Sequence, residues 1–225
     1  MAQRRLVFAA AALIVGPLQF AAANIVAQLA WTTPYSLAHN NISDLGNVHC
    51  QVSEDGVPRY ICSPLHELLN TSAVLCGVLL IVGLALSSVL WRRSWVGALA
   101  CVLLALGGSG FVLAGLAPAD VDLNLHVVGA FLIMGVGNLG LALSAFARRG
   151  NPFAELRVIT VAATAIAVVA TWTHFSHSYG PFGMGGSERF ALFTTQLWFV
   201  LLGANLLRAE VRQSSRPPHP SVDHR

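Results

Sequence analysis

The sequence contains no lysine, and only 10% of its 225 residues are charged. Soluble domains carry about 25% charged residues, so this composition is not that of a soluble globular protein. Spacings typical of zinc fingers, phosphate-binding loops and dinucleotide folds are missing as well. The net charge of +3 is too small to indicate a nucleic-acid partner. We therefore expect no nucleic acid and no cofactor.

What the chain has is long apolar segments, because 55% of its residues are hydrophobic. A helix needs about 20 residues to cross about 30 Å of hydrocarbon, and lipid leaves an open sheet edge unsatisfied. The pattern predicts an all-α polytopic membrane protein: a six-transmembrane-helix bundle over residues 1–208 and a disordered cytoplasmic tail over 209–225. The six runs are Leu6–Trp31, Leu65–Leu90, Val96–Ala117, Leu125–Phe146, Val158–Phe175 and Phe190–Leu207.

The placement of arginine predicts the orientation of these helices. Of the 13 arginines, only Arg59 and Arg189 fall on one side, and the others fall on the opposite side. Basic loops stay in the cytoplasm. We therefore expect a multi-pass protein of the cell membrane with both termini cytoplasmic. The first apolar run exceeds the roughly 7–15 residues of a signal peptide, which favours an uncleaved span over a leader.

The longest polar segment between apolar runs, residues 35–67, connects the first two predicted spans. It contains Asp44 and His66, and it contains two of the four cysteines, Cys50 and Cys62. This loop is expected to be extracytoplasmic, where an oxidising compartment favours a disulfide between the two cysteines over free thiols.

The turn formers around Ser43 and Asp44 end in Gly46. Asp44 either pins a tight loop or pairs with a cation or a metal, and both alternatives stay open. Asp122 and His126 are four residues apart, so they share a helix face, where the carboxylate can orient the imidazole. The alternative is a polar pair at the start of a helix.

Two further groups lie near the last two predicted spans. His174 and His177 are three residues apart and are weak candidates for metal ligands, with interfacial histidines as the alternative. Glu188 suits the positive end of the last helix, whereas Arg189 needs a carboxylate or a phosphate at the margin of the lipid. We expect Asp44 to be that partner, with Glu188 or a lipid headgroup as alternatives.

Four short motifs resemble those of a bacterial membrane-protein family, the domain of unknown function 998. They are ISDLG after the first span, CSPLH at the second, LH-x-x-G-A at the fourth and SER at the sixth. The resemblance covers about Leu6 to Leu207. The family itself is similar, more distantly, to the Frag–DRAM–Sfk proteins, which are linked to lipid handling. It implies a six-helix fold in which Ser43, Asp44, His126 and Arg189 are shared positions, and it implies no established reaction.

Three hypotheses for function follow. The first is an outward-facing polar pocket that binds a membrane lipid headgroup or a small anionic ligand. Its residues would be Asp44, His66, His126, Glu188 and Arg189. The second is a membrane-embedded lipid hydrolase or acyl-transfer enzyme with Ser43, Asp44 and His126 as catalytic candidates, or with a metal held by histidines. No nucleophile-elbow or HExxH motif supports this enzyme. The third is a structural membrane protein without a ligand.

Overall fold

The computed structural model describes residues 2–53, 57–147 and 155–214. Within these residues, six helices are long and apolar enough to cross a membrane. The predicted all-α fold and multi-pass membrane character are therefore confirmed. The helical elements are α1 (Ala2–Leu29), η1 (Ser43–Gly46), α2 (His66–Trp91), α3 (Trp95–Leu116), α4 (Leu123–Phe131), η2 (Leu132–Gly137), α5 (Asn138–Ser144), α7 (Arg157–Phe175), η3 (Gly180–Phe182) and α8 (Gly183–Ser214).

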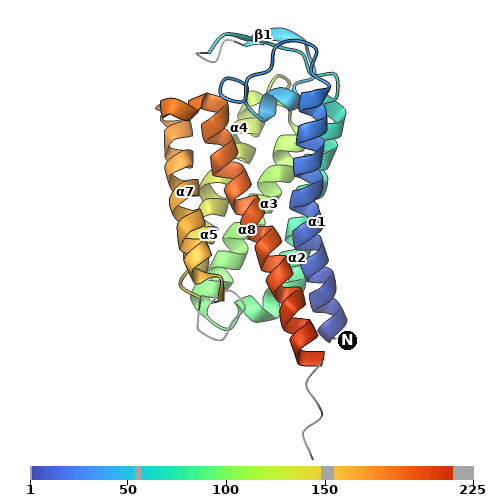
Figure 1. Cartoon of the computed structure of the whole chain (residues 1–225), viewed down its shortest axis with the longest axis vertical. Helices are drawn as coiled ribbons and strands as arrows, with labels where there is room; N and C mark the ends of the chain where they lie inside the picture. Colours follow the sequence, from blue (N-terminus) through green and yellow to red (C-terminus); the bar gives the residue numbers. More distant parts are fainter. Residues whose placement is uncertain (1, 54–56, 148–154, 215–225) are drawn as a thin grey trace, which may run out of the picture.

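The helices pack in chain order as a closed ring. α1 contacts both α2 and α8, α3 contacts α2 and the α4–η2–α5 segment, and α7 contacts α5 and α8. Figure 1 shows that the N-terminus and the end of α8 lie at the same end of the bundle, with β1 at the other. We call these the terminal end and the hairpin end. The side of the membrane that each end faces stays a prediction.

The last helix is longer than the apolar run that predicted it. α8 begins at Gly183, ahead of Phe190, and continues past Arg208 to Ser214. Residues 209–214 contain Ala, Glu, Arg and Gln, which favour helix and extend it beyond the apolar segment. The remainder of the predicted tail, residues 215–225, lies outside the described residues.

The fourth span contains a π-helical segment, η2, between α4 and α5. A π turn loosens the regular backbone ladder and leaves carbonyls for other donors. Here the carbonyl of Met134 accepts a hydrogen bond of 3.1 Å from the hydroxyl of Thr171 on α7. The Asn138 amide donates to Thr171 at 2.9 Å and to the carbonyl of Ala191 on α8 at 3.0 Å. Buried polar groups thus join the fourth span to α7 and α8.

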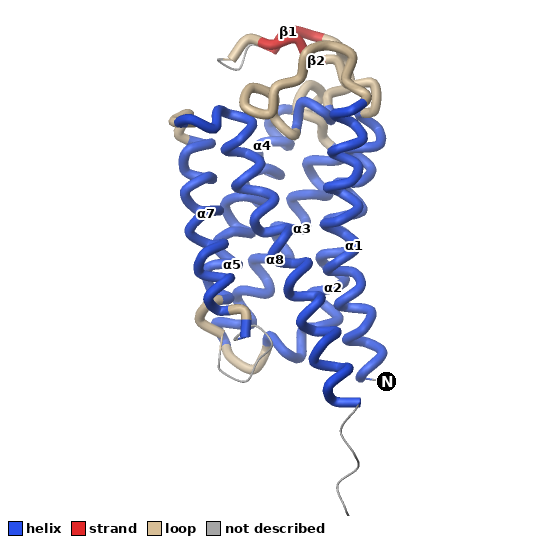
Figure 2. Tube along the Cα trace, viewed as in Figure 1, coloured by secondary structure: helices blue, strands red, loops and turns tan. Residues whose placement is uncertain are grey.

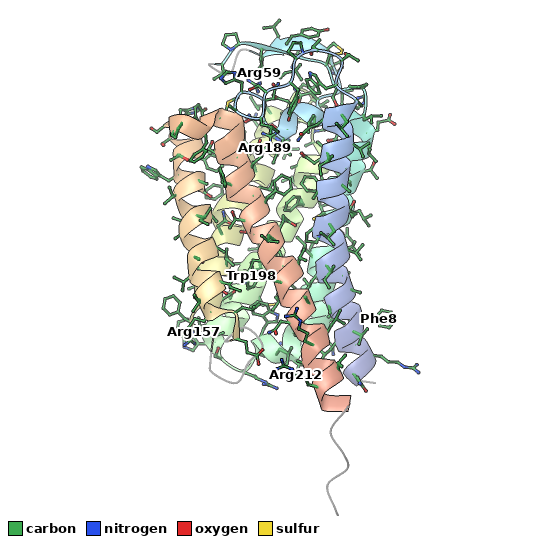
Figure 3. The ribbon with its side chains drawn as sticks, viewed as in Figure 1. Phe8, Arg59, Arg157, Arg189, Trp198 and Arg212 are labelled. Atoms are coloured by element: carbon green, nitrogen blue, oxygen red, sulfur yellow. A yellow bond between two sulfur atoms is a disulfide. The ribbon has the colours of Figure 1, made fainter. Side chains whose placement is uncertain are left out.

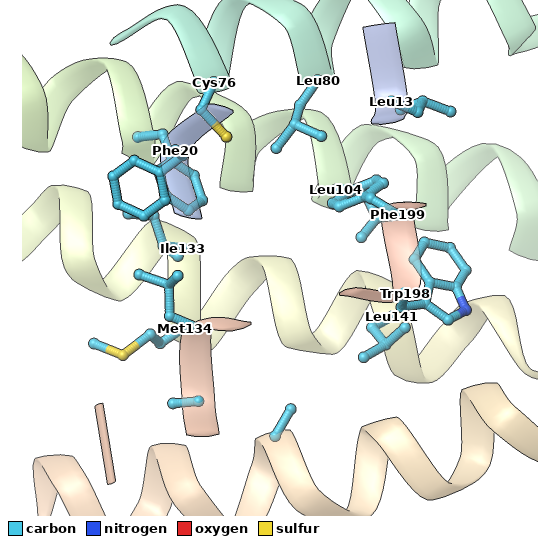
Figure 4. Packing of buried hydrophobic residues seen from close by; sticks show 14 of the residues in the cluster. Leu13, Phe20, Cys76, Leu80, Leu104, Ile133, Met134, Leu141, Trp198 and Phe199 are labelled. Carbon is cyan, nitrogen blue, oxygen red and sulfur yellow. The ribbon is translucent and has the colours of Figure 1, made fainter. Parts of the chain in front are cut away.

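The core runs along the axis of the bundle, and Figure 4 shows the aliphatic and aromatic side chains that fill it. Phe20 and Phe111 pack edge to face with ring centroids 5.3 Å apart. Small residues let the backbones approach closely, because a Cβ atom added at Gly110 would lie 2.6 Å from the carbonyl of Gly129. This close approach is typical of helix packing in membranes, where small residues line the contacts.

A short hairpin covers the hairpin end, where the tube in Figure 2 shows its two strands above the helices. Strands β1 (Gln51–Ser53) and β2 (Arg59–Ile61) pair antiparallel, although the sequence did not predict them. The disulfide between Cys50 and Cys62 extends the ladder by one position, with the two Cα atoms 4.2 Å apart. The predicted disulfide is therefore confirmed in the structure, and it closes the open end of the hairpin.

Candidate functional site

The ISDLG motif forms η1 and is held against the bundle from two helices. On the α2 side, the Asn70 amide donates to the carbonyl of Gly46 at 2.8 Å, and the Ser63 hydroxyl donates to that of Leu45 at 2.7 Å. On the α8 side, the carboxylate of Glu188 accepts a hydrogen bond from the backbone N–H of Ile42. The motif is thereby tied to both α2 and α8 at the hairpin end.

Asp44 forms its ion pair with Arg59, so the expected pairing with Arg189 is wrong. Arg59 donates from Nε and Nη2 to the two carboxylate oxygens, each at 2.6 Å. The side chains of Arg59 and Asp44 are only 8% and 4% exposed. The hairpin carries Arg59 over η1 from strand β2, and Figure 3 shows Arg59 above the helix ends, with Arg189 below it on α8. A bidentate pair of this kind joins the hairpin to the ISDLG motif.

The two Nη atoms of Arg189 donate to oxygen atoms of residues 35–40 and of Gly185, whereas its Nε is buried without a hydrogen-bond partner among the described residues. Its Nη1 donates to the carbonyls of Asn40 at 2.7 Å, Leu37 at 3.2 Å and Gly185 at 2.9 Å. Its Nη2 donates to the hydroxyl of Tyr35, and the guanidinium lies 5.7 Å from the centre of that ring. Burial raises the pKa of Tyr35, although the positive charge of Arg189 opposes that shift, so the hydroxyl stays neutral.

His126 lies at the start of the fourth span, and its Nδ1 lies 2.9 Å from the carbonyl of Ala117. A carbonyl only accepts, so Nδ1 is the donor in this hydrogen bond. Asp122 instead caps α4 by accepting from the backbone N–H of Leu125 at 3.0 Å. The expected contact between the carboxylate of Asp122 and the imidazole of His126 is therefore replaced by two separate backbone interactions.

Asp120 anchors the first loop to the turn between α3 and α4. Its carboxylate accepts from the backbone N–H groups of Val48 at 3.1 Å and His49 at 2.6 Å, and from the His49 ring at 3.0 Å. Burial raises the pKa of Asp120, but these hydrogen bonds outweigh burial and hold the pKa below its ordinary value of 3.8. The carboxylate is thus stabilised in its charged form.

This anchor is expected to weaken in acid. A lowered folded-state pKa stabilises the protein above the unfolded pKa of 3.8, and that contribution is lost as pH falls through the folded value. Amide hydrogen exchange at Val48 and His49, corrected for intrinsic rates, should accelerate below pH 3.8 relative to pH 7. In Asp120→Asn the two amides should exchange fast at both pH values. Equal protection of both amides at both pH values in the parent chain would contradict this anchor.

Between the hairpin and the helix ends lies a cavity of about 610 Å³. Residues of β1 and β2 line it from one side, and residues of α4, α7 and α8 line it from the other. Its charged or catalytically capable lining includes Ser43, Asp44, Arg59, Asp120, His126, His174 and Glu188.

A second, apolar chamber of about 60 Å³ lies deeper among the helices. Phe20, Ala73 and Phe111 are among the residues that line it. The two cavities share wall residues, which are Ser43, His126, Ala130, Met134 and Glu188. A cavity with several charged residues in its wall and an apolar cavity therefore share the same side chains.

The structure brings some predicted site residues to this cavity and leaves others away from it. His66 does not line it, and its Nδ1 donates to the carbonyl of Ser63 at 3.0 Å. His174 lines it, with Nδ1 3.2 Å from the hydroxyl of Ser187. His177 contacts the hydroxyl of Tyr179 at 2.6 Å.

No group of three or more His, Cys, Asp or Glu residues suited to a metal occurs in the described part of the chain.

Two residues that the enzyme hypothesis requires, Ser43 and His126, lie in the walls of one cavity. Within residues 2–53, 57–147 and 155–214, however, no hydrogen bond joins the Ser43 hydroxyl to a histidine or a carboxylate. Asp44 is fully engaged by Arg59 and by the amide groups of Asn40 and Asn41. The catalytic assignment of Ser43, Asp44 and His126 therefore stays a prediction.

Comparison with known proteins decides the family. The model of the DUF998 family, described as a protein of unknown function, matches residues 14–205. The chain belongs to this family. Neither the curated proteins nor the solved structures include a match. The DUF998 match includes residues from each of the six membrane helices in the described part of the chain, whereas the likeness to Frag–DRAM–Sfk proteins stays a prediction.

The ISDLG and SER motifs meet in the fold, although sequence analysis missed some of their partners. ISDLG lies on η1, and the SER motif supplies Glu188 and Arg189 beneath it. Arg59, Tyr35 and Asp120 were not among the expected site residues. A signal for Arg59 was present, because it is one of only two arginines on its side of the predicted spans.

Proposed function

We propose that this protein binds an amphiphilic lipid at its hairpin end. The headgroup would occupy the 610 Å³ cavity under β1 and β2, and part of the apolar chain would enter the adjoining chamber. The arginine distribution supports a location in the cell membrane, with the termini cytoplasmic and the hairpin end outside.

The observation that supports this proposal is the shared wall between the two cavities. Ser43, His126 and Glu188 supply polar atoms at this boundary, and Ala130 and Met134 supply apolar ones. Phe20, Phe111 and Ile133 continue the apolar lining inward. Two adjoining cavities, one with charged residues in its wall and one with an almost wholly apolar wall, match a molecule with a headgroup and a hydrocarbon chain.

Filling the apolar chamber is expected to remove bound lipid. Ala73 is 8% exposed and lines the chamber, so Ala73→Phe would place a ring where the chain of the lipid is expected. Lipid that copurifies in mild detergent should be quantified by native mass spectrometry. We expect occupancy to fall about tenfold relative to the parent protein, a change of about 1.4 kcal/mol in binding free energy.

Ala22→Phe is the matched control, because Ala22 is exposed on the lipid-facing side of α1. This variant should retain the lipid occupancy of the parent protein. Both variants should elute at the same volume in size-exclusion chromatography. Equal elution would show that Ala73→Phe loses lipid because its chamber is filled and not because the protein has unfolded. A parent protein that carries no lipid, or equal lipid in both variants, would overturn the proposal and favour a structural role.

A further inference from the structure

We infer that the headgroup cavity recognises a primary ammonium group and that the carboxylate of Glu188 is its counter-ion. This inference rests on the proposed lipid-binding function and names the class of headgroup. It replaces the anionic ligand that the sequence suggested with a ligand that carries positive charge and N–H donors.

Glu188 is buried but incompletely satisfied. The residue is 7% exposed, and one carboxylate oxygen, Oε2, accepts from the backbone N–H of Ile42. Among the described residues no group donates to the other oxygen, Oε1, and Glu188 lines both cavities. The neighbouring Arg189 donates to carbonyls and to Tyr35 instead. A buried carboxylate of this kind needs a charged or donating partner.

Two amide oxygens in the same lining also lack donors. The Oδ1 atoms of Asn41 and Asn47 are buried without a hydrogen-bond partner in the described residues, and both residues line the larger cavity. A primary ammonium offers three N–H donors, whereas a trimethylammonium group offers none. The set of unpartnered acceptors, Glu188, Asn41 and Asn47, therefore favours a primary amine.

The charges that line the cavity disfavour a headgroup of net negative charge. The described lining contains three carboxylates, Asp44, Asp120 and Glu188, and one guanidinium, Arg59. Arg59 is already neutralised by Asp44 through two hydrogen bonds of 2.6 Å. The positive N-terminus of α4 is capped by Asp122. Among the described lining residues, a net negative headgroup would find no arginine that is not already paired with a carboxylate, whereas an ammonium would find Glu188.

The test uses the full-length protein in mild detergent with an equimolar mixture of three lipids of matched chains. Phosphatidylethanolamine supplies a primary ammonium, phosphatidylcholine a trimethylammonium, and phosphatidylglycerol a net negative charge. Native mass spectrometry should show phosphatidylethanolamine bound about tenfold more than either competitor, the gain expected for one charge-assisted interaction. Glu188→Gln, which keeps an oxygen for the N–H of Ile42, should reduce this preference to about twofold or less.

Glu67→Gln is the matched control, because Glu67 is an exposed glutamate at the same end of the bundle. It should keep the full preference for phosphatidylethanolamine. Asn47→Ala provides a second variant should Glu188→Gln fail to fold, and it should lower the preference about threefold by removing one acceptor.

The outcomes separate this inference from the function it rests on. Binding of all three lipids alike, or a preference for phosphatidylglycerol, would overturn ammonium recognition while leaving lipid binding intact. Absence of any bound lipid would overturn the proposed function itself. Soluble phosphoethanolamine should compete only weakly, and competition as strong as that of the lipid would show that the ligand is a free amine without a chain.

Discussion

Asp44→Ala is expected to lower the free energy of unfolding by about 3–5 kcal/mol, because it leaves a buried guanidinium without its carboxylate. Arg59 is 8% exposed at its side chain and directs two donors at Asp44. Asn40 and the backbone N–H of Asn41 would also lose their acceptor, at 3.2 Å and 3.0 Å. Thermal and denaturant unfolding of the purified protein in detergent would measure the loss.

Two controls separate the ion pair from a general effect of removing charge. Glu67→Ala removes an exposed carboxylate at the same end and should leave stability within about 0.5 kcal/mol of the parent protein. Glu54, in the same loop as Asp44, lies outside the described residues and makes a weaker comparison. The double variant Asp44→Leu/Arg59→Met should recover much of the loss, since it leaves no unpaired charge. Equal stability of Asp44→Ala and Glu67→Ala would refute the buried pair.

The sequence predicted the membrane fold well because lipid imposes one strong constraint. Backbone groups in hydrocarbon must be paired within the helix, so long apolar runs identify spans directly. The run Val96–Ala117 corresponds to α3, Trp95–Leu116, within one residue at each end. The predicted and observed boundaries agree less well where polar residues continue a helix. The predicted run began at Phe190, whereas α8 begins at Gly183.

The π segment η2 could not be read from the sequence, because its residues are as apolar as those of a regular helix. The run LIMGVG contains no proline or charge that would mark it. Its partner is Thr171, which in turn accepts from Asn138, and both are single polar residues within apolar surroundings. Their positions indicate contact between helices, but sequence spacing does not reveal which helix provides the partner.

Several residues named from the sequence lie together in the structure, but the predicted partner of Asp44 was wrong. Asp44, His126 and Glu188 do line one cavity, as their places at outer helix ends suggested. Arg59, however, lies in a loop with no apolar periodicity, so nothing fixed its distance from Asp44. The hairpin and its disulfide determine that distance, and strand pairing over three residues is too short to leave a clear pattern.

Arg189→Ala is the second change with a large expected effect, because one guanidinium holds together the first loop and the start of α8. Its donors reach the carbonyls of Leu37, Asn40 and Gly185 and the hydroxyl of Tyr35. The backbones are close there, since a Cβ atom added at Gly185 would lie 2.7 Å from the carbonyl of Leu37. Several carbonyls would lose a charged donor together, so we expect a loss of about 3 kcal/mol or more.

Arg189→Lys should recover only about 1 kcal/mol of this loss, because an ammonium on a flexible stem cannot reproduce the planar fork that spans the carbonyls and Tyr35. Arg4→Ala, at an exposed position of the terminal end, should change stability by less than about 0.5 kcal/mol. Unfolding in detergent measures all three variants. Loosening of the loop should also release Ile42 from Glu188, so Arg189→Ala should accelerate amide exchange at Ile42. Full rescue by lysine would mean that Arg189 acts through its charge alone and that its hydrogen-bond geometry is dispensable.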